Sequence, residues 1–283
     1  MKKNAGIKNI FDLGFPADEK VLKNCFDKRN SITVIAAPTG EGKTTTLYSI
    51  LDYLNRPEIN ITTVEDPVEI RVPGINQIEI DAKATFASSL RTILRQDPDI
   101  ILLGEIRDLE TAEIALQAGQ TGHYVLSTIH TINAIEVVTR LRKMGISDYD
   151  ISSTLATAVS QRLIRKICPD CAMKRQFTNE EKEIITKMKA RFGEEVDFKN
   201  KFTYDVKGCK NCNHTGFLGR IATFEILNLS EGIKDVVIGG GSSSAIREIA
   251  LKEGYRPLYV DAINKVVNGI ITLEEVNKKL ALY

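Results

Sequence analysis

Residues 38–44 form the run Pro-Thr-Gly-Glu-Gly-Lys-Thr, in which two glycines precede a lysine and a threonine. Glycines let the backbone curl so that N–H groups point inwards at an anion, and a helix N-terminus adds to this attraction. The Lys43 ammonium would reach the β- and γ-phosphates of ATP, and the Thr44 hydroxyl would bind Mg²⁺. The pattern predicts a phosphate-binding loop made of Pro38, Thr39, Gly40, Glu41, Gly42, Lys43, Thr44 and Thr45.

The loop departs from the pattern G-x-x-x-x-G-K-[ST] at its first position, where Ala37 stands. Alanine is the smallest substitute for glycine, and we expect this position, at a strand end, not to need a positive φ. The setting also fits, because an apolar run precedes the loop and a helical pattern follows it. The alternative is a glycine turn that binds nothing.

Two acidic sites follow buried strands, where a doubly wound sheet places its ligands. Glu65 and Asp66 end the run 60–64, and Glu105 follows the apolar run 100–103 and Gly104. Hydrolysis of ATP needs one carboxylate to activate water and another to hold the water shell of magnesium. We expect Glu65 to be the base and Glu105 to serve the metal. The roles could be exchanged, or either carboxylate could cap the next helix.

Histidines and arginines lie near the same segments. His130 ends the apolar run 124–129 and could contact a γ-phosphate, and His123 precedes that run. Either histidine could instead be a structural hydrogen-bonding group. Arginines suited to pairing with phosphate or carboxylate stand at Arg91, Arg95 and Arg107, although solvent-exposed helix faces would explain them too.

Four of the five cysteines form two C-x-x-C pairs, Cys168/Cys171 and Cys209/Cys212. Two such pairs can close a tetrahedral thiolate site for zinc with no position left open for catalysis. A redox pair or buried thiols are the alternatives. Cys25 stands alone and is expected to be a small core residue.

Apolar strands alternating with amphipathic helices up to about residue 150 predict an α/β fold with a parallel sheet. A hairpin is expected at 70–82, an exposed helix at 179–195, a final strand at 220–227, a flexible connector at 239–244 and a helical tail at 245–280. The expected organisation is a lead-in at 1–30, a core at 31–165, a tetracysteine module at 166–215 and a C-terminal region at 216–283.

Composition limits the class of protein. The formal net charge is +1, the hydrophobic content is 43%, and tryptophan is absent. These values disfavour a nucleic-acid partner, although a local basic stripe could still exist. No apolar stretch reaches the length of a membrane span and no signal peptide is visible, so the expected location is cytoplasmic.

Taken together, these segments resemble the secretion ATPases of type II secretion systems and type IV pilus assembly. The similar runs are residues 37–48, 63–69, 90–99, 100–108, 121–131 and 216–220 together with the cysteine pairs. The resemblance implies a RecA-like motor with a tetracysteine insertion and a C-terminal helical region. It also implies a hexameric ring that is peripheral to the inner membrane and works with platform and adaptor proteins.

The resemblance also implies roles for single residues. Glu65 and Asp66 match the aspartate box, Glu105 the Walker B position, and His123 and His130 the histidine box. Arg91, Arg95 and Arg107 match arginines that brace the aspartate box, and Arg220 matches one near the nucleotide.

One departure affects the expected activity. Members of that family carry N-terminal domains that supply arginines to the bound nucleotide, and here about 30 residues precede the loop strand. We therefore expect a fragment, a truncated product or a motor whose other half is separate, with weak activity in isolation. Two other functions stay open: a nucleic-acid translocase on a RecA-like core, and a nucleotide-binding assembly module with little turnover.

Overall fold

The structure is a computed structural model that describes residues 6–81 and 84–280. The chain forms two compact units, one of residues 1–161 and 226–255 and the other of residues 162–225 and 256–283. The strands β6 (Leu155–Ile167) and β9 (Phe217–Asn228) contribute residues to both units. Each unit is therefore made of two separate stretches of chain, whereas the segments expected from the sequence are consecutive.

The first unit is built on a sheet with the strand order β3-β2-β4-β5-β1-β6-β9. The pairs β1–β5, β1–β6, β2–β3, β2–β4 and β4–β5 are parallel. Every residue of β1, β2, β4 and β5 is buried, as expected for strands covered on both faces. The predicted α/β class with a parallel sheet is thus confirmed. The strand bounds are β1 Ser31–Ala36, β2 Ile61–Glu65, β3 Asn76–Glu79, β4 Ile100–Leu103 and β5 Tyr124–Ile129.

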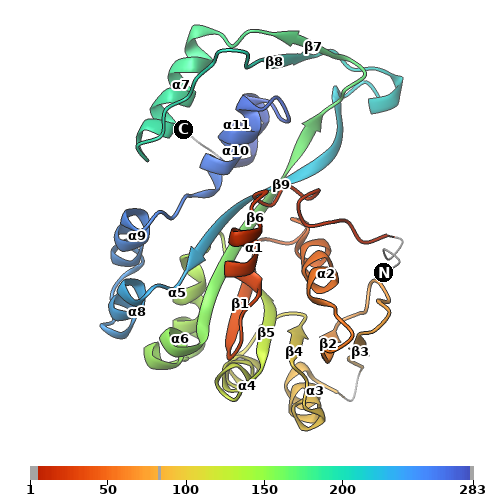
Figure 1. Cartoon of the computed structure of the whole chain (residues 1–283), viewed down its shortest axis with the longest axis vertical. Helices are drawn as coiled ribbons and strands as arrows, with labels where there is room; N and C mark the ends of the chain where they lie inside the picture. The colour runs from red at the N-terminus through yellow and green to blue at the C-terminus, as the bar shows by residue number, and fades with distance from the viewer. Residues whose placement is uncertain (1–5, 82–83, 281–283) are drawn as a thin grey trace. The chain divides into compact units, whose positions relative to one another are not determined.

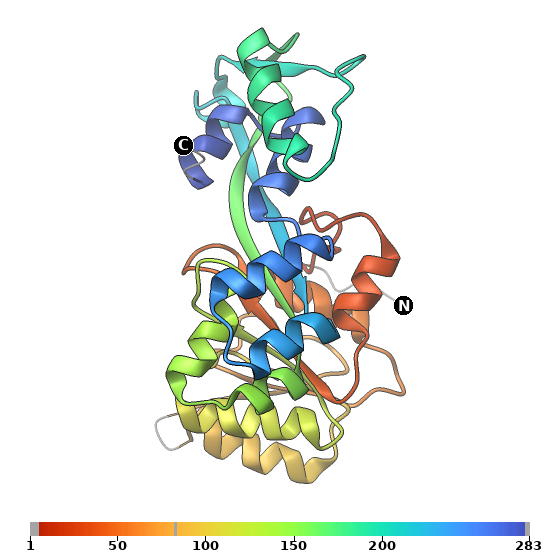
Figure 2. The ribbon, with the colours of Figure 1, turned by 90° about the vertical axis from the view of Figure 1, so that its left-hand side faces the viewer.

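Helices cover both faces of this sheet (Figures 1 and 2). Alternate side chains of a strand point to opposite faces, and Ile32 and Val34 of β1 join a core cluster with α3 and α4. Between them, the hydroxyl of Thr33 donates to the carbonyl of Cys25 on α1 at 3.2 Å, on the other face. The helices of this unit are α1 Glu19–Phe26, α2 Lys43–Leu54, α3 Phe86–Ile93 with the 3-10 turn Leu94–Gln96, α4 Leu109–Gln120, α5 Glu136–Met144, α6 Asp148–Thr154, α8 Glu231–Ile238 and α9 Ser243–Lys252.

The hairpin expected at 70–82 is wrong over its described part; residue 82 lies outside the described residues. The strand β3 pairs in parallel with β2, in the register Thr62↔Asn76 to Glu65↔Glu79. Residues 66–75 therefore run from the C-terminal end of β2 back to the level of its N-terminal end, so that β3 starts beside the start of β2 and no hairpin forms. Prolines at 67 and 73 interrupt this return. The sequence pattern also missed the long strand β6 and the helix α6.

The second unit combines the outer parts of β6 and β9 with a small antiparallel sheet of β7 (Ala172–Arg175) and β8 (Thr203–Val206). Its helices are α7 (Asn179–Ala190), α10 (Leu258–Val267) and α11 (Leu273–Leu280). Their apolar faces share one cluster, which includes Ile185, Ile263 and Val276. A capping box between Thr178 and Glu181 starts α7, which is shorter than the helix expected at 179–195.

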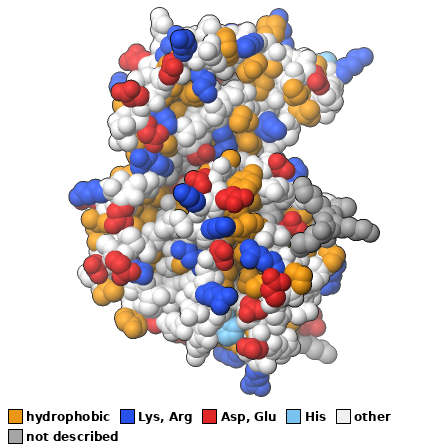
Figure 3. Space-filling view, in the orientation of Figure 1, with side chains coloured by type: hydrophobic (Ala, Val, Ile, Leu, Met, Phe, Trp, Pro, Cys, Tyr) orange, Lys and Arg blue, Asp and Glu red, His pale blue; other side chains and the backbone are white. Residues whose placement is uncertain are grey.

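Among the described residues, no helix is both long and apolar enough to span a bilayer. The face in Figure 3 carries Lys and Arg side chains mixed with Asp and Glu side chains, in keeping with the formal net charge of +1.

Candidate active site

The loop after β1 has the backbone expected for holding phosphate. Gly40 and Gly42 adopt left-handed conformations, with φ of 79° and 83°, and Gly42 is the N-cap of α2. These φ values favour glycine, so the two glycines of the pattern are needed here. Ala37 is buried and does not adopt a left-handed conformation, which explains why alanine serves at the first position.

Lys43 lies at the N-terminus of α2 and folds back over the loop. Its Nζ donates to the carbonyls of Ala37 at 2.7 Å and Pro38 at 3.1 Å, and it lies 3.5 Å from Nδ1 of His130. On the other side of the imidazole, Nε2 lies 3.2 Å from Oε2 of Glu105. A continuous polar chain therefore joins the loop lysine to the carboxylate that follows β4.

The charge state of His130 fixes the direction of these bonds. Burial lowers the pKa of the His130 imidazole below its ordinary value, and the nearby positive charges of Lys43, Arg107 and Arg140 lower it further. The ring is therefore neutral at neutral pH, with one nitrogen donating and one accepting. Because an ammonium can only donate, Nδ1 accepts from Lys43 and Nε2–H donates to Glu105.

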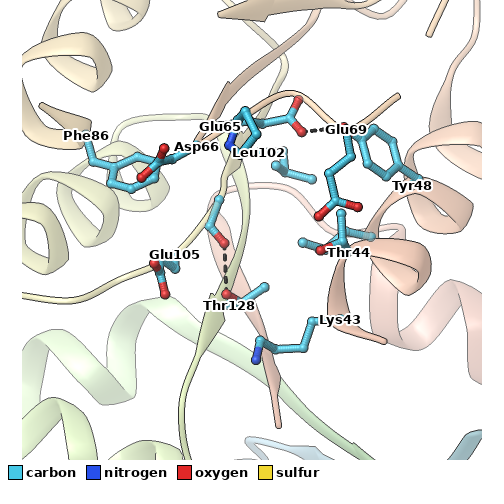
Figure 4. A pocket seen from close by; sticks show the side chains of 13 residues that line it. Lys43, Thr44, Tyr48, Glu65, Asp66, Glu69, Phe86, Leu102, Glu105 and Thr128 are labelled. Carbon is cyan, nitrogen blue, oxygen red and sulfur yellow. Dashed lines mark hydrogen bonds between the residues drawn. The ribbon is translucent and has the colours of Figure 1, made fainter. Parts of the chain in front are cut away.

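Glu65 is in a different situation, although it lines the same pocket (Figure 4). The residue is only 5% exposed. Its Oε1 accepts from the hydroxyl of Thr63 at 2.5 Å and from Nε2 of Gln77 at 3.1 Å, and its Oε2 accepts from Tyr48 at 2.5 Å. Both carboxylate oxygens are thus engaged by neutral donors of the protein itself.

Arg107 joins the two acidic strand ends. Its guanidinium contacts Glu105 and lies 3.9 Å from Asp66. It also lies over the ring of Phe86, 5.9 Å from the ring centroid. The carboxyl ends of β2 and β4 are therefore linked by one cation beside the pocket.

Outside the phosphate loop and the cysteines, six predicted site residues do not line this pocket: His130 and Arg107, which contact Glu105, and His123, Arg95, Arg91 and Arg220. His123 precedes β5, where its Nδ1 lies 3.1 Å from the carbonyl of Ala118, and Arg95 lies in the turn before β4. Both residues lie at the N-terminal ends of the parallel strands, whereas the phosphate loop lies at their C-terminal ends. Neither side chain lies beside the phosphate loop of its own chain, and the predicted nucleotide contacts of His123 and Arg95 stay predictions.

The other two residues also have other surroundings. Arg91 pairs with Glu110 on α4 at 2.8 Å, both side chains being exposed, and its predicted bracing of the aspartate box stays a prediction. Arg220 is an exposed residue of β9 in the second unit, and its predicted nucleotide contact stays a prediction.

Sequence reasoning missed two residues that line the pocket and one that supports the phosphate loop. Tyr48 and Glu69 line it, and the Glu69 carboxylate extends towards Thr44 in the view of Figure 4. Gln161 of β6 is fully buried and donates from Nε2 to the carbonyl of Glu41 in the loop at 2.7 Å. Glu69 could have been found from the sequence, because it is an acidic residue four positions after Glu65. Gln161 could not, because only the fold brings it to the loop.

The second unit holds a separate cluster in which the four cysteine sulfurs lie within 4.8 Å of one another. The Sγ–Sγ distances are 3.9 Å for Cys168–Cys209, 3.8 Å for Cys171–Cys212 and 3.7 Å for Cys209–Cys212. Tetrahedral bonding at a metal–sulfur distance of about 2.3 Å requires sulfurs about 3.8 Å apart. The four thiolates therefore fit one tetrahedral metal ion.

Local hydrogen bonds prepare this cluster for a metal. The backbone N–H groups of Cys209 and Gly216 donate to Sγ of Cys212 at 3.1 and 3.2 Å. Burial by itself raises the pKa of the Cys212 thiol, but these donors outweigh it and lower the pKa to about 6. Cys212 is thus favoured as the thiolate, which is the form that binds metal, whereas burial and then the thiol of Cys212 raise the pKa of Cys171 to about 12.

A glycine-lined loop before a helix, facing strand-end carboxylates on a parallel sheet, defines the P-loop class of nucleotide-binding proteins. A family model described as "Type II/IV secretion system protein" matches residues 1–278. The chain belongs to this family, as the runs quoted from the sequence predicted.

Two curated relatives illustrate the similarity. The chain is 41% identical over 279 residues to the type IV pilus assembly ATPase PilB of Thermus thermophilus, covering 98% of this chain and 31% of the relative. It is 40% identical over 262 residues to type II secretion system protein E of Aeromonas hydrophila, covering 92% of this chain and 50% of the relative. The chain thus spans about a third to a half of the length of these relatives.

Solved structures show the same fold. The pilus retraction motor PilT with bound ADP superposes with a TM-score of 0.71 at 28% identity, over 97% of this chain and 67% of that one. The ATPase DotB of Legionella pneumophila is similar in fold, with a TM-score of 0.67 at 22% identity over 96% of this chain and 64% of that one.

Proposed function

We propose that this chain is the ATP-hydrolysing motor unit of a type II secretion or type IV pilus assembly machine. The observation that carries the proposal is the polar chain Lys43–His130–Glu105, which links the phosphate loop to a strand-end carboxylate at one edge of the sheet. The names of the relatives, pilus assembly ATPase and secretion system protein E, support the same function.

In the proposed reaction, the N–H groups of residues 39–44 and the Lys43 ammonium bind the β- and γ-phosphates. The Thr44 hydroxyl would bind Mg²⁺, and the carboxylates of Asp66 and Glu69, which line the same pocket, would accept hydrogen bonds from its water shell. A bound Mg²⁺ would neutralise charge on the phosphates.

We assign the activation of the attacking water to Glu105, the exchanged role that the sequence left open. The neutral imidazole of His130 connects the carboxylate of Glu105 to the ammonium of Lys43. A change in the position of Lys43 at the γ-phosphate can therefore be transmitted to the base through His130. Glu65 is nearly buried, and neutral donors of the protein occupy both of its carboxylate oxygens, so an attacking water has less access to it.

The four cysteines would hold Zn²⁺ as a closed structural site, because sulfur occupies all four positions. We further propose a hexameric ring that acts at the cytoplasmic face of the inner membrane, attached through platform and adaptor proteins. The proposed machine has no nucleic-acid partner.

The decisive experiment measures phosphate release from Mg-ATP by the wild type and by Lys43→Ala. We expect loss of more than about 100-fold in kcat, since the loop cation stabilises charge in the transition state. The matched control is Lys187→Ala, an exposed lysine of α7, which should leave the rate unchanged. Equal rates for all three proteins, or stimulation by DNA instead of by machine components, would contradict the proposal.

A further inference from the structure

One tyrosine of the phosphate-loop helix contacts both ends of an acidic segment beside the pocket. Tyr48 lies on α2, five residues after Lys43, and is 3% exposed. Its hydroxyl donates to Oε2 of Glu65 at 2.5 Å and accepts from the backbone N–H of Ile70 at 3.2 Å. Residues 65–70, which we name the acidic segment, are therefore tied to α2 through one phenol oxygen.

The acidic segment carries groups that face the phosphate loop. Asp66, Pro67 and Glu69 line the pocket together with Lys43 and Thr44. On its other side, the segment is held by β3. Glu79 accepts from the N–H of Val68 at 3.0 Å, and Gln77 donates to the carbonyl of Ile70 at 2.9 Å. The β3 contacts fix the segment to the sheet edge, and Tyr48 fixes it to the helix that begins at the loop.

The phenol is suited to this task over a wide pH range. Burial, and then the hydrogen bond to Glu65, raises the pKa of Tyr48 to about 12. The hydroxyl therefore stays protonated and keeps donating at any working pH. Because its proton points at Glu65, its oxygen lone pair is left to accept from Ile70. Both bonds are formed at once and neither needs a change of charge.

We propose that Tyr48 is a positioning residue that couples the phosphate-loop helix to the acidic segment, so that Asp66 and Glu69 are held in register with Lys43 and Thr44. This inference rests on the proposed hydrolysis and assigns a role within it. Because α2 begins at the loop, movement of the loop on nucleotide binding is passed to the acidic segment through a rigid helix.

The first test is Tyr48→Phe, which removes the hydroxyl and keeps the ring. We expect kcat to fall by about 10- to 100-fold while KM for ATP changes less than about threefold, because positioning acts on the reaction more than on binding. The matched control is Tyr53→Phe on the same helix, which should have the rate of the wild type. An unchanged kcat for Tyr48→Phe would overturn the proposal.

A double-mutant cycle separates coupling through Glu65 from a general loss of stability. In the Glu65→Gln background, Tyr48→Phe should lower kcat by less than about threefold, because the contact through which it acts is already altered. If it lowers kcat by the same factor in both backgrounds, the coupling is wrong. Melting temperatures of all four proteins identify any variant that has simply lost its fold.

A third measurement does not need turnover. Hydrogen exchange of the amides of residues 66–72 should slow when Mg-ADP binds to the wild type, and this response should be lost in Tyr48→Phe. If the wild type binds Mg-ADP but hydrolyses no ATP, the proposed function fails while this response still decides the coupling. A response retained in Tyr48→Phe, or absent from the wild type, overturns it.

Discussion

The two units of the chain differ in what stabilises their folds. The first unit buries four complete strands beneath helices on both faces, and its site stands at the edge of this core. The second unit has a smaller apolar cluster, and its four cysteines come from two short loops that approach one another. In the first unit, packing supports the functional groups; in the second, we expect the candidate metal ligands to contribute to the stability of the fold.

Polar groups of the first unit are thus expected to serve the reaction, whereas the cysteines of the second unit are expected to stabilise its fold. Lys43 and Glu105 lie at the ends of elements that are already stabilised by burial, so replacing them should cost activity more than stability. Replacing a cysteine ligand should do the reverse, because metal binding to a small unit contributes directly to its folding free energy.

The largest effect is expected from Cys171→Ser. We expect loss of bound zinc and a fall of about 10 °C or more in the melting temperature of the second unit, because an incomplete ligand set removes several kcal/mol of folding free energy. Metal analysis and calorimetry measure both. The control is Cys25→Ala, a buried cysteine outside the cluster, which should keep its zinc. Native protein without zinc would contradict the metal assignment.

The next effect concerns the two glutamates of the pocket. We expect Glu105→Gln to lower kcat by about 100-fold or more with little change in melting temperature. Glu65→Gln should lower kcat less, by about tenfold, but should lower the melting temperature, because a buried acceptor of three hydrogen bonds is altered. Glu110→Gln is the exposed control. The reverse order of the kcat values would restore Glu65 as the base.

A smaller effect is expected from an ion pair of the second unit. Arg165 donates from Nε and Nη2 to the nearly buried carboxylate of Glu275 at 2.6 and 2.7 Å. Replacing it by Met should cost about 1 kcal/mol of unfolding free energy, because the half-exposed guanidinium is screened by solvent. Chemical denaturation measures this cost.

The pH dependence of the same pair supplies its check. Arg165 lowers the pKa of the Glu275 carboxyl, so the stabilisation is complete above the pKa of an unfolded glutamate, which is about 4.3. It is lost as the pH falls through the lower folded value. The wild type and Arg165→Met should therefore converge in stability at acid pH. A difference that stays constant there would assign the effect to packing against Phe217 instead.

The smallest effect concerns His130. Because its pKa is lowered, the acid limb of kcat/KM should lie below the ordinary pKa of imidazole. Arg140→Ala removes one of the positive charges that lower this pKa, so the limb should move to higher pH without a change in the plateau rate. Measurement of the rate against pH for both proteins tests this. A shift to lower pH would exclude His130 as the titrating group.

The sequence alone determined the features that are written locally. The strand bounds at 100–103 and 124–129 agree with the structure, because short apolar runs between turn residues and helices have few other solutions. The phosphate loop and the paired cysteines were also predicted, since the glycine positions and the C-x-x-C spacing encode their geometry directly.

Which residues come into contact depends on the tertiary fold. Residues 70–82 alternate like a hairpin, but their described part pairs in parallel with β2. His123 directly precedes β5 and His130 directly follows it, so they lie at opposite ends of the strand, and only His130 lies beside the lysine of the loop. Glu65 ends β2 and Glu105 follows β4, yet their partners differ. Tyr48 and Gln77 donate to Glu65, whereas His130 connects Glu105 to the lysine of the loop. These outcomes depend on the pairing of segments far apart in the chain, and no local pattern records that pairing.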